Sequence, residues 1–214
     1  TYFVQLDTDG EVYVIGQSLG DIQVSPDVYS NPGGRQFVQK YSADLTTLEW
    51  STTIGSNDNQ INFSPSAFLV TNCSDIYVSG WGGSTNNFGQ AGGTTLGLPT
   101  TPDAYQSSTD GSDFYLMVLS EDAQDLTYAT FFGGNQSAEH VDGGTSRFDK
   151  NGTVYQAVCA GCGGLSDFPS QPGVWSQTNP SSNCNLGVFK FRLSSVSALA
   201  DVDFTTTPPL SLIL

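Results

Sequence analysis

One pattern of residues occurs three times in this chain of 214 residues, and it restricts the folds that the chain can adopt. Each copy has two short runs of alternating apolar residues, separated by a turn-forming stretch. When the copies are aligned, Tyr13, Tyr77 and Tyr155 occupy the same position. Alternation with a period of two predicts strands, and Asn, Asp and Gly between them predict tight hairpins. The copies are residues 6–14 (LDTDGEVYV), 70–78 (VTNCSDIYV) and 148–158 (FDKNGTVYQAV).

The repeat continues beyond each hairpin. A further strand is predicted in every copy, and the first two copies add a fourth at residues 48–56 and 126–134. Each unit is therefore predicted to form four antiparallel strands. The intervening loops hold a proline and an aromatic residue, at 25–29 (SPDVY), 101–105 (TPDAY) and 171–175 (QPGVW). The unit boundaries fall near 1–64, 65–142 and 143–199.

A single four-stranded sheet of this size cannot bury its faces, whereas several such sheets stacked around an axis can. The sequence therefore predicts an all-β protein, a β-propeller whose blades are four-stranded antiparallel sheets. The composition agrees, with 24 Gly, 10 Pro, 13 Phe, 9 Tyr and 3 Trp, and no window shows the periodicity of a helix. A β-sandwich is the alternative, but it gives no reason for one four-strand pattern to recur.

The third unit lacks a clear fourth strand. Residues 202–204 could close that blade, or they could begin a following domain, in which case residues 200–214 are a linker or its first strand. Three blades do not close a ring, because propellers usually have about 4 to 8. Either further blades lie outside this chain, or the chain contains one more blade than the three that the repeat reveals.

The order of these motifs resembles that of a known family. Hairpins of the form D-x-x-G-x-V-Y-V, a P-x-x-Y/W loop, a strand F-V-x-K and a strand ending in Gly-Gly look like the bacterial seven-bladed β-propeller repeat of the SBBP type. Residues 154–191 are similar to large secreted surface proteins of the Bacteroidota, and the likeness covers about residues 3–194. The second unit departs from the family pattern at residues 72–74 (NCS), where the turn usually carries Asp and Gly.

The resemblance has implications beyond the blades. It implies type IX secretion, a gliding-motility-type C-terminal sorting domain and PKD domains in the same polypeptide. Residues 200–210 (ADVDFTTTPPL) resemble the opening strand of such a PKD domain. The neighbouring domains of that polypeptide are therefore expected partners of this segment.

The charge of the chain argues against two classes of partner. The formal net charge is −15 and only six residues are Lys or Arg, so the surface repels the phosphates of nucleic acid and anionic lipid. No apolar run approaches the roughly 20 residues that span a bilayer, and we expect no membrane insertion. Low Lys and Glu content and four cysteines favour an extracellular or cell-surface location. The first residues already read as a strand, so we expect an export signal upstream.

The four cysteines allow more than one arrangement. In a four-stranded blade the second strand ends on the side where the third begins, which favours a disulfide between Cys162 and Cys184 around a loop of about 20 residues. Cys159 is the alternative partner. Cys159 and Cys162 also have the spacing of half a zinc site or of a redox motif. Cys73 lies in a hairpin turn at the opposite end of its blade and has no evident partner.

The aromatic residues form two groups. Three of them, Trp81, Phe88 and Trp175, fall in predicted long loops. An aromatic ring there can stack on a sugar or contact a protein, or it can fold back over the blade edge. We take Trp81, Phe88 and Trp175 as the candidate ligand-binding residues. The others alternate with polar neighbours and are predicted to pack between blades: Tyr13, Tyr77, Tyr155, Trp50 and Tyr128.

No pattern in the sequence indicates a catalytic centre or a resident cofactor. His140 is the only histidine and has no nucleophile motif around it, so we expect a surface or loop residue. Residues 7–10 (DTDG) and 149–152 (DKNG) resemble the start of a calcium loop. A strand follows each at once, which favours a role in shaping the turn. Calcium binding elsewhere on so acidic a surface stays open.

The function that this sequence favours is display. Rigid blades would hold loops 19–34, 81–111 and 160–186 on one face. We expect a non-catalytic, exported scaffold or adhesion module that binds a glycan or a protein at the cell surface. One alternative is a pure spacer in a surface filament, and another is a propeller glycosidase or lyase. The enzyme would use loop-face carboxylates, namely Asp103, Asp110, Asp113 and Asp167, which no spacing pairs.

Overall fold

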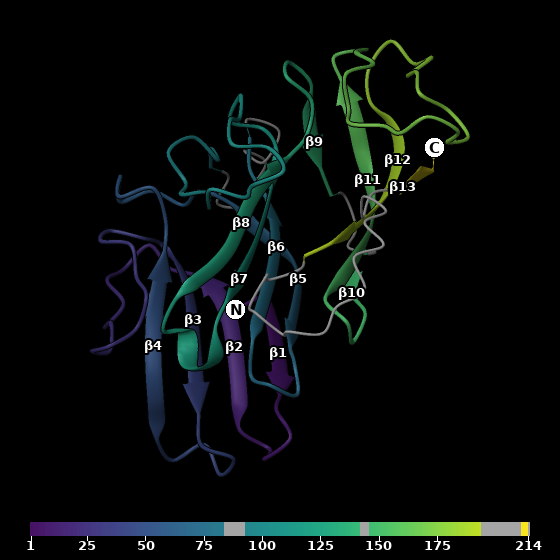
Figure 1. The fold of residues 1–214 in the computed structure, drawn as a ribbon. Helices are drawn as coiled ribbons and strands as arrows, with labels where there is room; N and C mark the ends of the chain where they lie inside the picture. The colour runs from purple at the N-terminus through teal and green to yellow at the C-terminus, as the bar shows by residue number, and fades with distance from the viewer. Residues whose placement is uncertain (84–92, 142–145, 194–210, 214) are drawn as a thin grey trace.

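A computed structural model of the chain describes residues 1–83, 93–141, 146–193 and 211–213. These residues form three antiparallel sheets, with a single 3₁₀ turn at Glu121–Ala123. The predicted all-β class is confirmed, although the described sheets do not close into a ring. Figure 1 shows the first sheet in purple and blue, the second in blue and teal, and the third in green and yellow. Within the described ranges, no helix has the length and hydropathy needed to span a bilayer.

The first two sheets share one strand order. Consecutive strands are neighbours, so that a long loop joins two hairpins. The first sheet contains β1 (Phe3–Leu6), β2 (Val12–Gln17), β3 (Gln36–Tyr41) and β4 (Leu48–Ile54). The second contains β5 (Ser64–Val70), β6 (Ile76–Trp81), β7 (Phe114–Leu119) and β8 (Leu126–Phe132). The pairing of β3 with β4 shifts register after Lys40, and that of β7 with β8 shifts after the equivalent residue, Val118. The two sheets therefore share this irregularity as well as the strand order.

The third sheet differs at both edges. Its central strands are β11 (Thr153–Cys162) and β12 (Asn185–Arg192). Two short segments, β9 (Ala138–His140) and β10 (Arg147–Phe148), pair with β11 where the other sheets have one first strand. On the far side, β13 (Ser211–Ile213) pairs with β12. Residues 211–213 thus add an outer strand, where a linker or another domain was expected, while residues 202–204 lie outside the described part.

The three repeated hairpin turns have the same geometry. In each, a side-chain oxygen of the first turn residue accepts the backbone N–H groups two and four residues further on. The fourth residue of the turn has a positive φ, which suits Gly10 and Gly152 and which Ser74 adopts at 61°. The second unit therefore makes the same turn despite its different sequence. The first turn residues are Asp7, Thr71 and Asp149.

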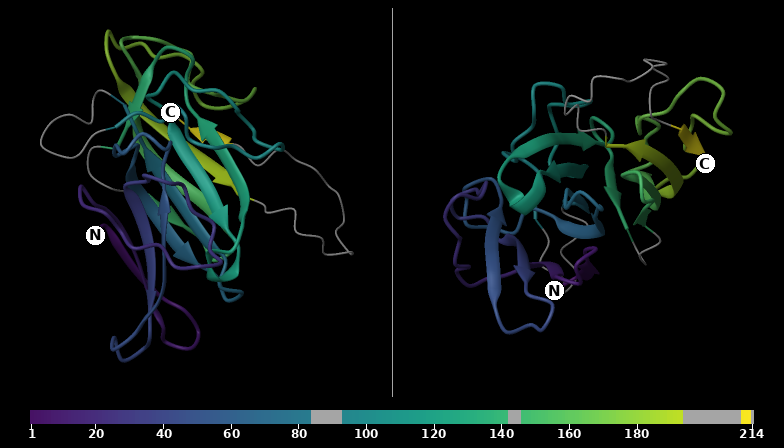
Figure 2. Two further views of the ribbon diagram at one scale, coloured as in Figure 1. Left: turned by 90° about the vertical axis from the view of Figure 1, so that its left-hand side faces the viewer. Right: turned by 60° about the horizontal axis from the view of Figure 1, so that its bottom comes forward.

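The sheets pack face to face. Every residue of β6 and β7 is buried, because the second sheet contacts the first with one face and the third with the other. Tyr115 and Met117 belong to the core cluster on one side, and Leu116 and Val118 belong to the cluster on the other. Successive side chains of a strand point to opposite faces, so this alternation is expected of a strand covered on both. Figure 2 shows the sheets in this order from two further directions.

The matched tyrosines occupy equivalent positions, but only two are covered. Tyr13 is 0% exposed between the first and second sheets, and Tyr77 is 7% exposed between the second and third. Trp50 and Tyr128 are buried in the same two clusters, as predicted. Tyr155 is 39% exposed, so the prediction that it lies in the core is wrong. It lies on the outer face of the third sheet, which the described sheets leave uncovered.

Candidate functional site

The three long loops leave the sheets toward the top of Figure 1. They connect β2 to β3, β6 to β7, and β11 to β12. The first two loops follow the outer strand of their own sheet: Ser25 N donates to Ser51 O (2.9 Å), and Thr101 N donates to Ala129 O (3.1 Å). These bonds satisfy an otherwise open strand edge. They also fix the loops against the sheets.

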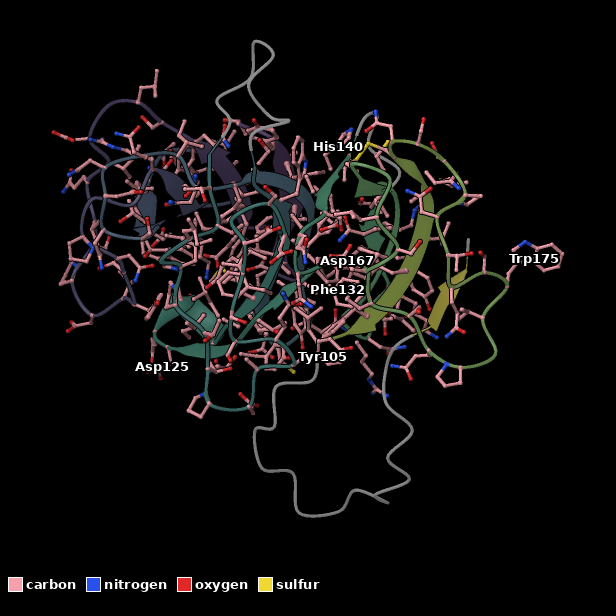
Figure 3. All side chains as sticks on the ribbon, turned by 90° about the horizontal axis from the view of Figure 1, so that it is seen from above. Tyr105, Asp125, Phe132, His140, Asp167 and Trp175 are labelled. Carbon is pink, nitrogen blue, oxygen red and sulfur yellow. A yellow bond between two sulfur atoms is a disulfide. The ribbon has the colours of Figure 1, made fainter. Side chains whose placement is uncertain are left out.

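Trp175 is the aromatic residue that stands out on this end of the molecule. It lies in the third loop, is 85% exposed and points away from the sheets (Figure 3). An indole ring offers a large, rigid contact surface at small cost in conformational entropy. Of the two candidate ligand-binding aromatics that the structure describes, Trp81 and Trp175, it leaves Trp175 open to a ligand.

Trp81 has a different environment. It is the last residue of β6 and is 9% exposed. Its ring packs in the core between the second and third sheets, with its centroid 5.8 Å from that of His140. The prediction that Trp81 is an exposed loop residue is therefore wrong, because β6 extends to it and the third sheet covers it. Phe88 lies outside the described residues.

A disulfide closes the base of the third loop. Cys162 and Cys184 are bonded, with an S–S distance of 2.09 Å and a separation of 22 residues. This is the pair that the sequence favoured. Cys162 ends β11 and Cys184 directly precedes β12, so the bond joins the two strands where the loop leaves them. Cys159 lies in β11 outside the disulfide, and Cys73 is exposed in its hairpin turn.

His140 lies beside this disulfide, in β9 and not in a loop. Its Nδ1 is 3.6 Å from Cys162 Sγ, and ligand atoms of His140, Cys162 and Cys184 lie within 4.8 Å of one another. Zinc binds cysteine as the thiolate, whereas these two sulfur atoms are bonded to each other. The cluster therefore reads as a packed disulfide and not as a metal centre.

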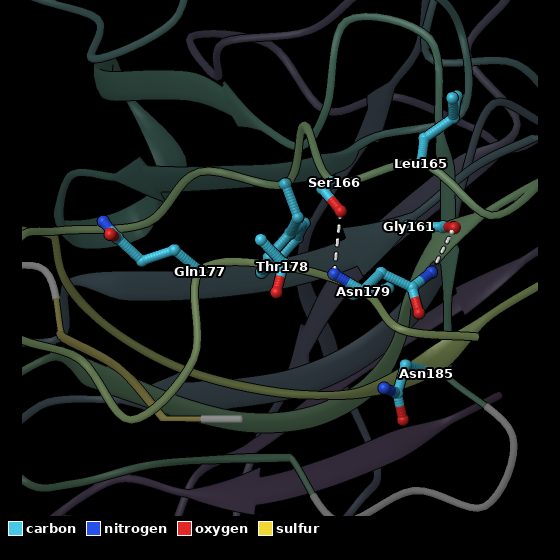
Figure 4. A pocket seen from close by; sticks show the side chains of 9 residues that line it. Gly161, Leu165, Ser166, Gln177, Thr178, Asn179 and Asn185 are labelled. Carbon is cyan, nitrogen blue, oxygen red and sulfur yellow. Dashed lines mark hydrogen bonds between the residues drawn. The ribbon is translucent and has the colours of Figure 1, made fainter.

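A shallow pocket lies under the third loop (Figure 4). The space that it encloses is about 20 Å³, far below the roughly 300–1,000 Å³ of small-ligand sites. Its lining combines apolar Leu165 and Phe168 with polar Gln177, Thr178 and Asn185. A hollow of this size holds about one water molecule, so ligand binding here would rest on the exposed surface of the loop.

Asn179 fixes the shape of the pocket. Its Nδ2 donates to Gly161 O (2.9 Å) and to Asn183 O (2.7 Å), and its Oδ1 accepts from Ser181 N (2.9 Å). Its backbone N donates to Ser166 Oγ (2.8 Å). The loop that carries Trp175 is thus held by side-chain hydrogen bonds as well as by the disulfide.

Three carboxylates gather where the second and third sheets meet. Asp113 and Glu139 are both 0% exposed. A Cβ on Gly133 would lie 2.0 Å from Asp113 Oδ1 and 2.5 Å from Glu139 Oε2, so both side chains crowd this glycine. Asp167 approaches from the third loop, near Phe132 in Figure 3. Sequence reasoning named Asp113 and Asp167 and missed Glu139, because its burial results from a contact between sheets that no local pattern marks.

Burial changes the ionisation of these acids. It raises the pKa of Asp113 to about 7 and that of Glu139 to about 8, since loss of water disfavours the charged carboxylate. Ser137 Oγ donates to Glu139 Oε1 (2.5 Å) and offsets part of this penalty. Burial also opposes the charge of Asp167, but hydrogen bonds from Ser137 and Gln136 outweigh it and lower the pKa of Asp167. The cluster therefore binds protons at neutral pH.

The arrangement of these acids disfavours glycoside hydrolysis. A glycosidase needs two carboxyl groups that both reach the substrate. Asp103 and Asp110 are exposed, whereas Asp113 is fully buried. None of the carboxylates named from the sequence lines the pocket under the third loop. Asp113 and Asp167 lie instead in the cluster between the second and third sheets, while Asp103 and Asp110 lie on the surface.

The two stretches that resemble calcium loops are hairpin turns. Oδ1 of Asp7 accepts from two backbone N–H groups at 3.0 and 2.9 Å, and Oδ1 of Asp149 does so at 2.8 and 3.0 Å. A carboxylate oxygen oriented by its own backbone stabilises the local turn. The turn-forming role is the one that this geometry supports.

No protein-family model and no curated protein matches this chain. A fold of stacked antiparallel sheets is compatible with many functions. The function therefore has to be inferred from the third loop and its surroundings.

Proposed function

We propose that this chain is a non-catalytic, exported cell-surface module that binds a glycan or a protein through its third long loop. The observation that carries the proposal is Trp175, 85% exposed on a loop that the Cys162–Cys184 bond closes. A rigid loop loses little entropy when it binds. Gln177 and Thr178, which follow Trp175 on the same loop, would supply hydrogen-bonding groups to the ligand.

The three sheets act as the rigid support, and we propose that they are blades of a β-propeller. The common strand order of the first two sheets supports this proposal, as does the burial of the second sheet on both faces. Propellers stack four-stranded sheets in this way. The disulfide supports export, because such bonds persist in oxidising compartments.

Substitution of Trp175 tests the binding proposal. The chain would be screened on a glycan array and against extracellular-matrix proteins, and Trp175→Ala should weaken the binding that is found at least tenfold, or about 1.4 kcal/mol. Leu19→Ala is the matched control, because Leu19 is 83% exposed on the first long loop and should leave binding unchanged. Equal loss in both variants would contradict a site at Trp175.

A pure spacer is the second candidate. If the chain binds none of the glycans and matrix proteins in the screen, the spacer role is favoured over ligand binding. A lyase or glycosidase is supported less, because the buried position of Asp113 keeps it from a substrate. Hydrolysis of a polysaccharide that is abolished by Asp113→Asn would reverse this preference.

A further inference from the structure

The contact between the first and second sheets has a polar centre. Lys40 Nζ lies 5.3 Å from the centre of the Tyr13 ring and reaches Asp122 of the β7–β8 turn, 3.1 Å away. Trp50 Nε1 donates to the same Asp122 oxygen (3.0 Å). Tyr13 and Lys40 are paired directly on β2 and β3. The first sheet thus supplies a Tyr–Lys pair together with Glu11, whose Oε2 lies 2.6 Å from Lys40 Nζ, and the second sheet supplies a further carboxylate.

The third sheet carries a second Tyr–Lys pair in the same register. Tyr155 and Lys190 are paired directly on β11 and β12, and Lys190 Nζ lies 5.4 Å from the centre of the Tyr155 ring. The pair is not common to every sheet, because the second has Val118 in the lysine position. Both Tyr155 and Lys190 are exposed. The outer face of the third sheet therefore repeats the Tyr–Lys pair, while Ser211 pairs with Lys190 where Trp50 pairs with Lys40.

The outer face of the first sheet carries the matching carboxylate. Its β3–β4 turn shares one hydrogen bond with the β7–β8 turn: the N–H of Ser42 or Ser120 donates to the carbonyl five residues further on, at 3.0 and 2.9 Å. Leu45 and Ala123 both have a positive φ, and Asp122 has one as well, whereas Asp44 does not. When these serines are aligned, Asp44 takes the position of Asp122. Asp44 is exposed. Asp44 Oδ1 accepts from Ser42 Oγ (2.7 Å) and Thr46 Oγ1 (2.8 Å) within the turn. The first sheet thus carries on its outer side a carboxylate at the position that the second sheet uses to bind Lys40.

Apolar residues near Asp44 are exposed although their counterparts in the second sheet are buried. Val4 and Leu6 correspond to Phe68 and Val70 by strand register, and Leu45 and Leu48 correspond to Ala123 and Leu126 when the turns are aligned. Val4, Leu6, Leu45 and Leu48 are 60, 60, 63 and 41% exposed. The counterparts pack in or against the core between the first and second sheets: Phe68, Val70, Ala123 and Leu126. Exposed apolar side chains at both edges of one sheet face are typical of an interaction surface.

The two outer faces have opposite charge. Arg147, Tyr155 and Lys190 lie in one row across β10, β11 and β12, and Arg192 follows Lys190 on the same face. Three of the six basic residues of a chain with net charge −15 are therefore on this face. The outer side of the first sheet presents Asp44. Opposite charges on two apolar faces favour their association and fix its orientation.

We propose that the outer face of the third sheet binds the outer face of the first sheet in a second copy of this chain. Tyr155 and Lys190 of one copy then contact Asp44 and the surrounding aliphatic side chains of the other, as Tyr13 and Lys40 contact the second sheet. The contact joins two different faces, so two copies either close into a ring through two equal contacts or extend into a filament. It does not involve Trp175 and goes beyond the proposed ligand binding.

Sedimentation velocity of the purified chain tests this surface. The concentration would run from about 1 μM to 1 mM at physiological ionic strength, which screens the repulsion between two acidic chains. Cys73→Ser is introduced throughout, because an exposed thiol can link copies covalently. We expect a reversible species of twice 22.7 kDa or larger. A chain that stays monomeric over this range would overturn the proposal, whether or not Trp175 binds a ligand.

Charge reversal identifies the faces involved. Lys190→Glu and Asp44→Lys should each weaken self-association at least tenfold, because each places like charges opposite one another. An equal mixture of the two variants should associate like the parent chain, since opposite charges then meet at both contacts. Lys150→Glu and Asp125→Lys make the same charge changes at exposed turn positions away from the two faces and should have little effect. Association that Lys190→Glu leaves intact, or that the mixture fails to restore, would refute the assigned faces.

Discussion

The contact between the first and second sheets and the contact between the second and third use equivalent positions but different chemistry. In the first sheet Gln36 pairs with Ile54, and in the second Phe114 pairs with Phe132 at the same register. The Gln36 amide, with its nitrogen toward Ile54 O, donates to that carbonyl (3.0 Å) and accepts from Asn62 N (2.8 Å). The first sheet therefore has a hydrogen-bonded amide and an isoleucine at the positions where the second sheet has two phenylalanines.

The second contact is the more aromatic of the two. The ring centre of Phe132 lies 4.7 Å from that of Phe189, 5.3 Å from Phe168 and 5.6 Å from Phe191. The first contact is built instead around Lys40 and its partners. The backbone repeat is therefore set by turns and register, while the side chains that fill each contact are free to differ.

Truncation in the aromatic contact should have the largest effect of any single substitution. Phe132 is 0% exposed, and Phe132→Ala removes a ring that four others surround, so we expect a loss of about 3–5 kcal/mol in the free energy of unfolding. Denaturant unfolding measures it. Ile54→Ala at the equivalent position is the matched comparison and should cost less, because a smaller side chain is removed. An equal or greater loss at Ile54 would contradict the difference drawn between the two contacts.

The hairpin turns and the strand register are the parts of this fold that the sequence predicts best. An Asp or Thr at the start of the turn bonds backbone groups two and four residues away, so the information is local. The burial of Trp81 and Glu139 could not be found in this way. Both residues are covered by a sheet that is distant in sequence, and nothing in their own neighbourhood signals it.

The candidate site was predictable to a similar degree. The position of Cys162 and Cys184 follows from the order of strands in one sheet, and the exposure of Trp175 agrees with its place in a long loop. Tyr155 has the same sequence context as Tyr13 and Tyr77. Its exposure depends on what covers the third sheet, which the pattern of one repeat does not contain.

The buried acids of the second contact should make stability depend on pH. The pKa values of Asp113 and Glu139 are raised in the folded state to about 7 and 8, above their ordinary values of 3.8 and 4.5. The folded protein therefore binds more protons than the unfolded chain between these limits, and stability falls as pH rises through the window. We expect the free energy of unfolding to fall by roughly 6 kcal/mol between pH 5 and pH 8 if the two effects add.

Neutral variants separate this effect from the general charge of the chain. Asp113→Asn with Glu139→Gln should flatten the dependence and raise the stability at pH 8, because no carboxylate then has to ionise in the interior. Asp103→Asn, at an exposed position, serves as the control. A steep fall that persists in the double variant would assign the pH dependence to other groups.

The smallest expected effect lies in the repeated hairpin turns. The fourth turn residue is Ser74 in the second sheet and Gly152 in the third. Ser74 has φ 61° at the position that Gly152 occupies at φ 75°, and an L side chain in this region is strained. Ser74→Gly removes the strain but frees the unfolded backbone, so we expect a net gain of about 0.5 kcal/mol or less. The reverse change, Gly152→Ser, should be destabilising, because a Cβ at Gly152 would lie 2.4 Å from Tyr77 Cε1. Thermal unfolding of both variants gives the comparison. We expect Ser74→Gly to raise the stability and Gly152→Ser to lower it. A loss of stability in Ser74→Gly would mean that the contacts of the serine side chain stabilise the fold by more than its backbone strain costs.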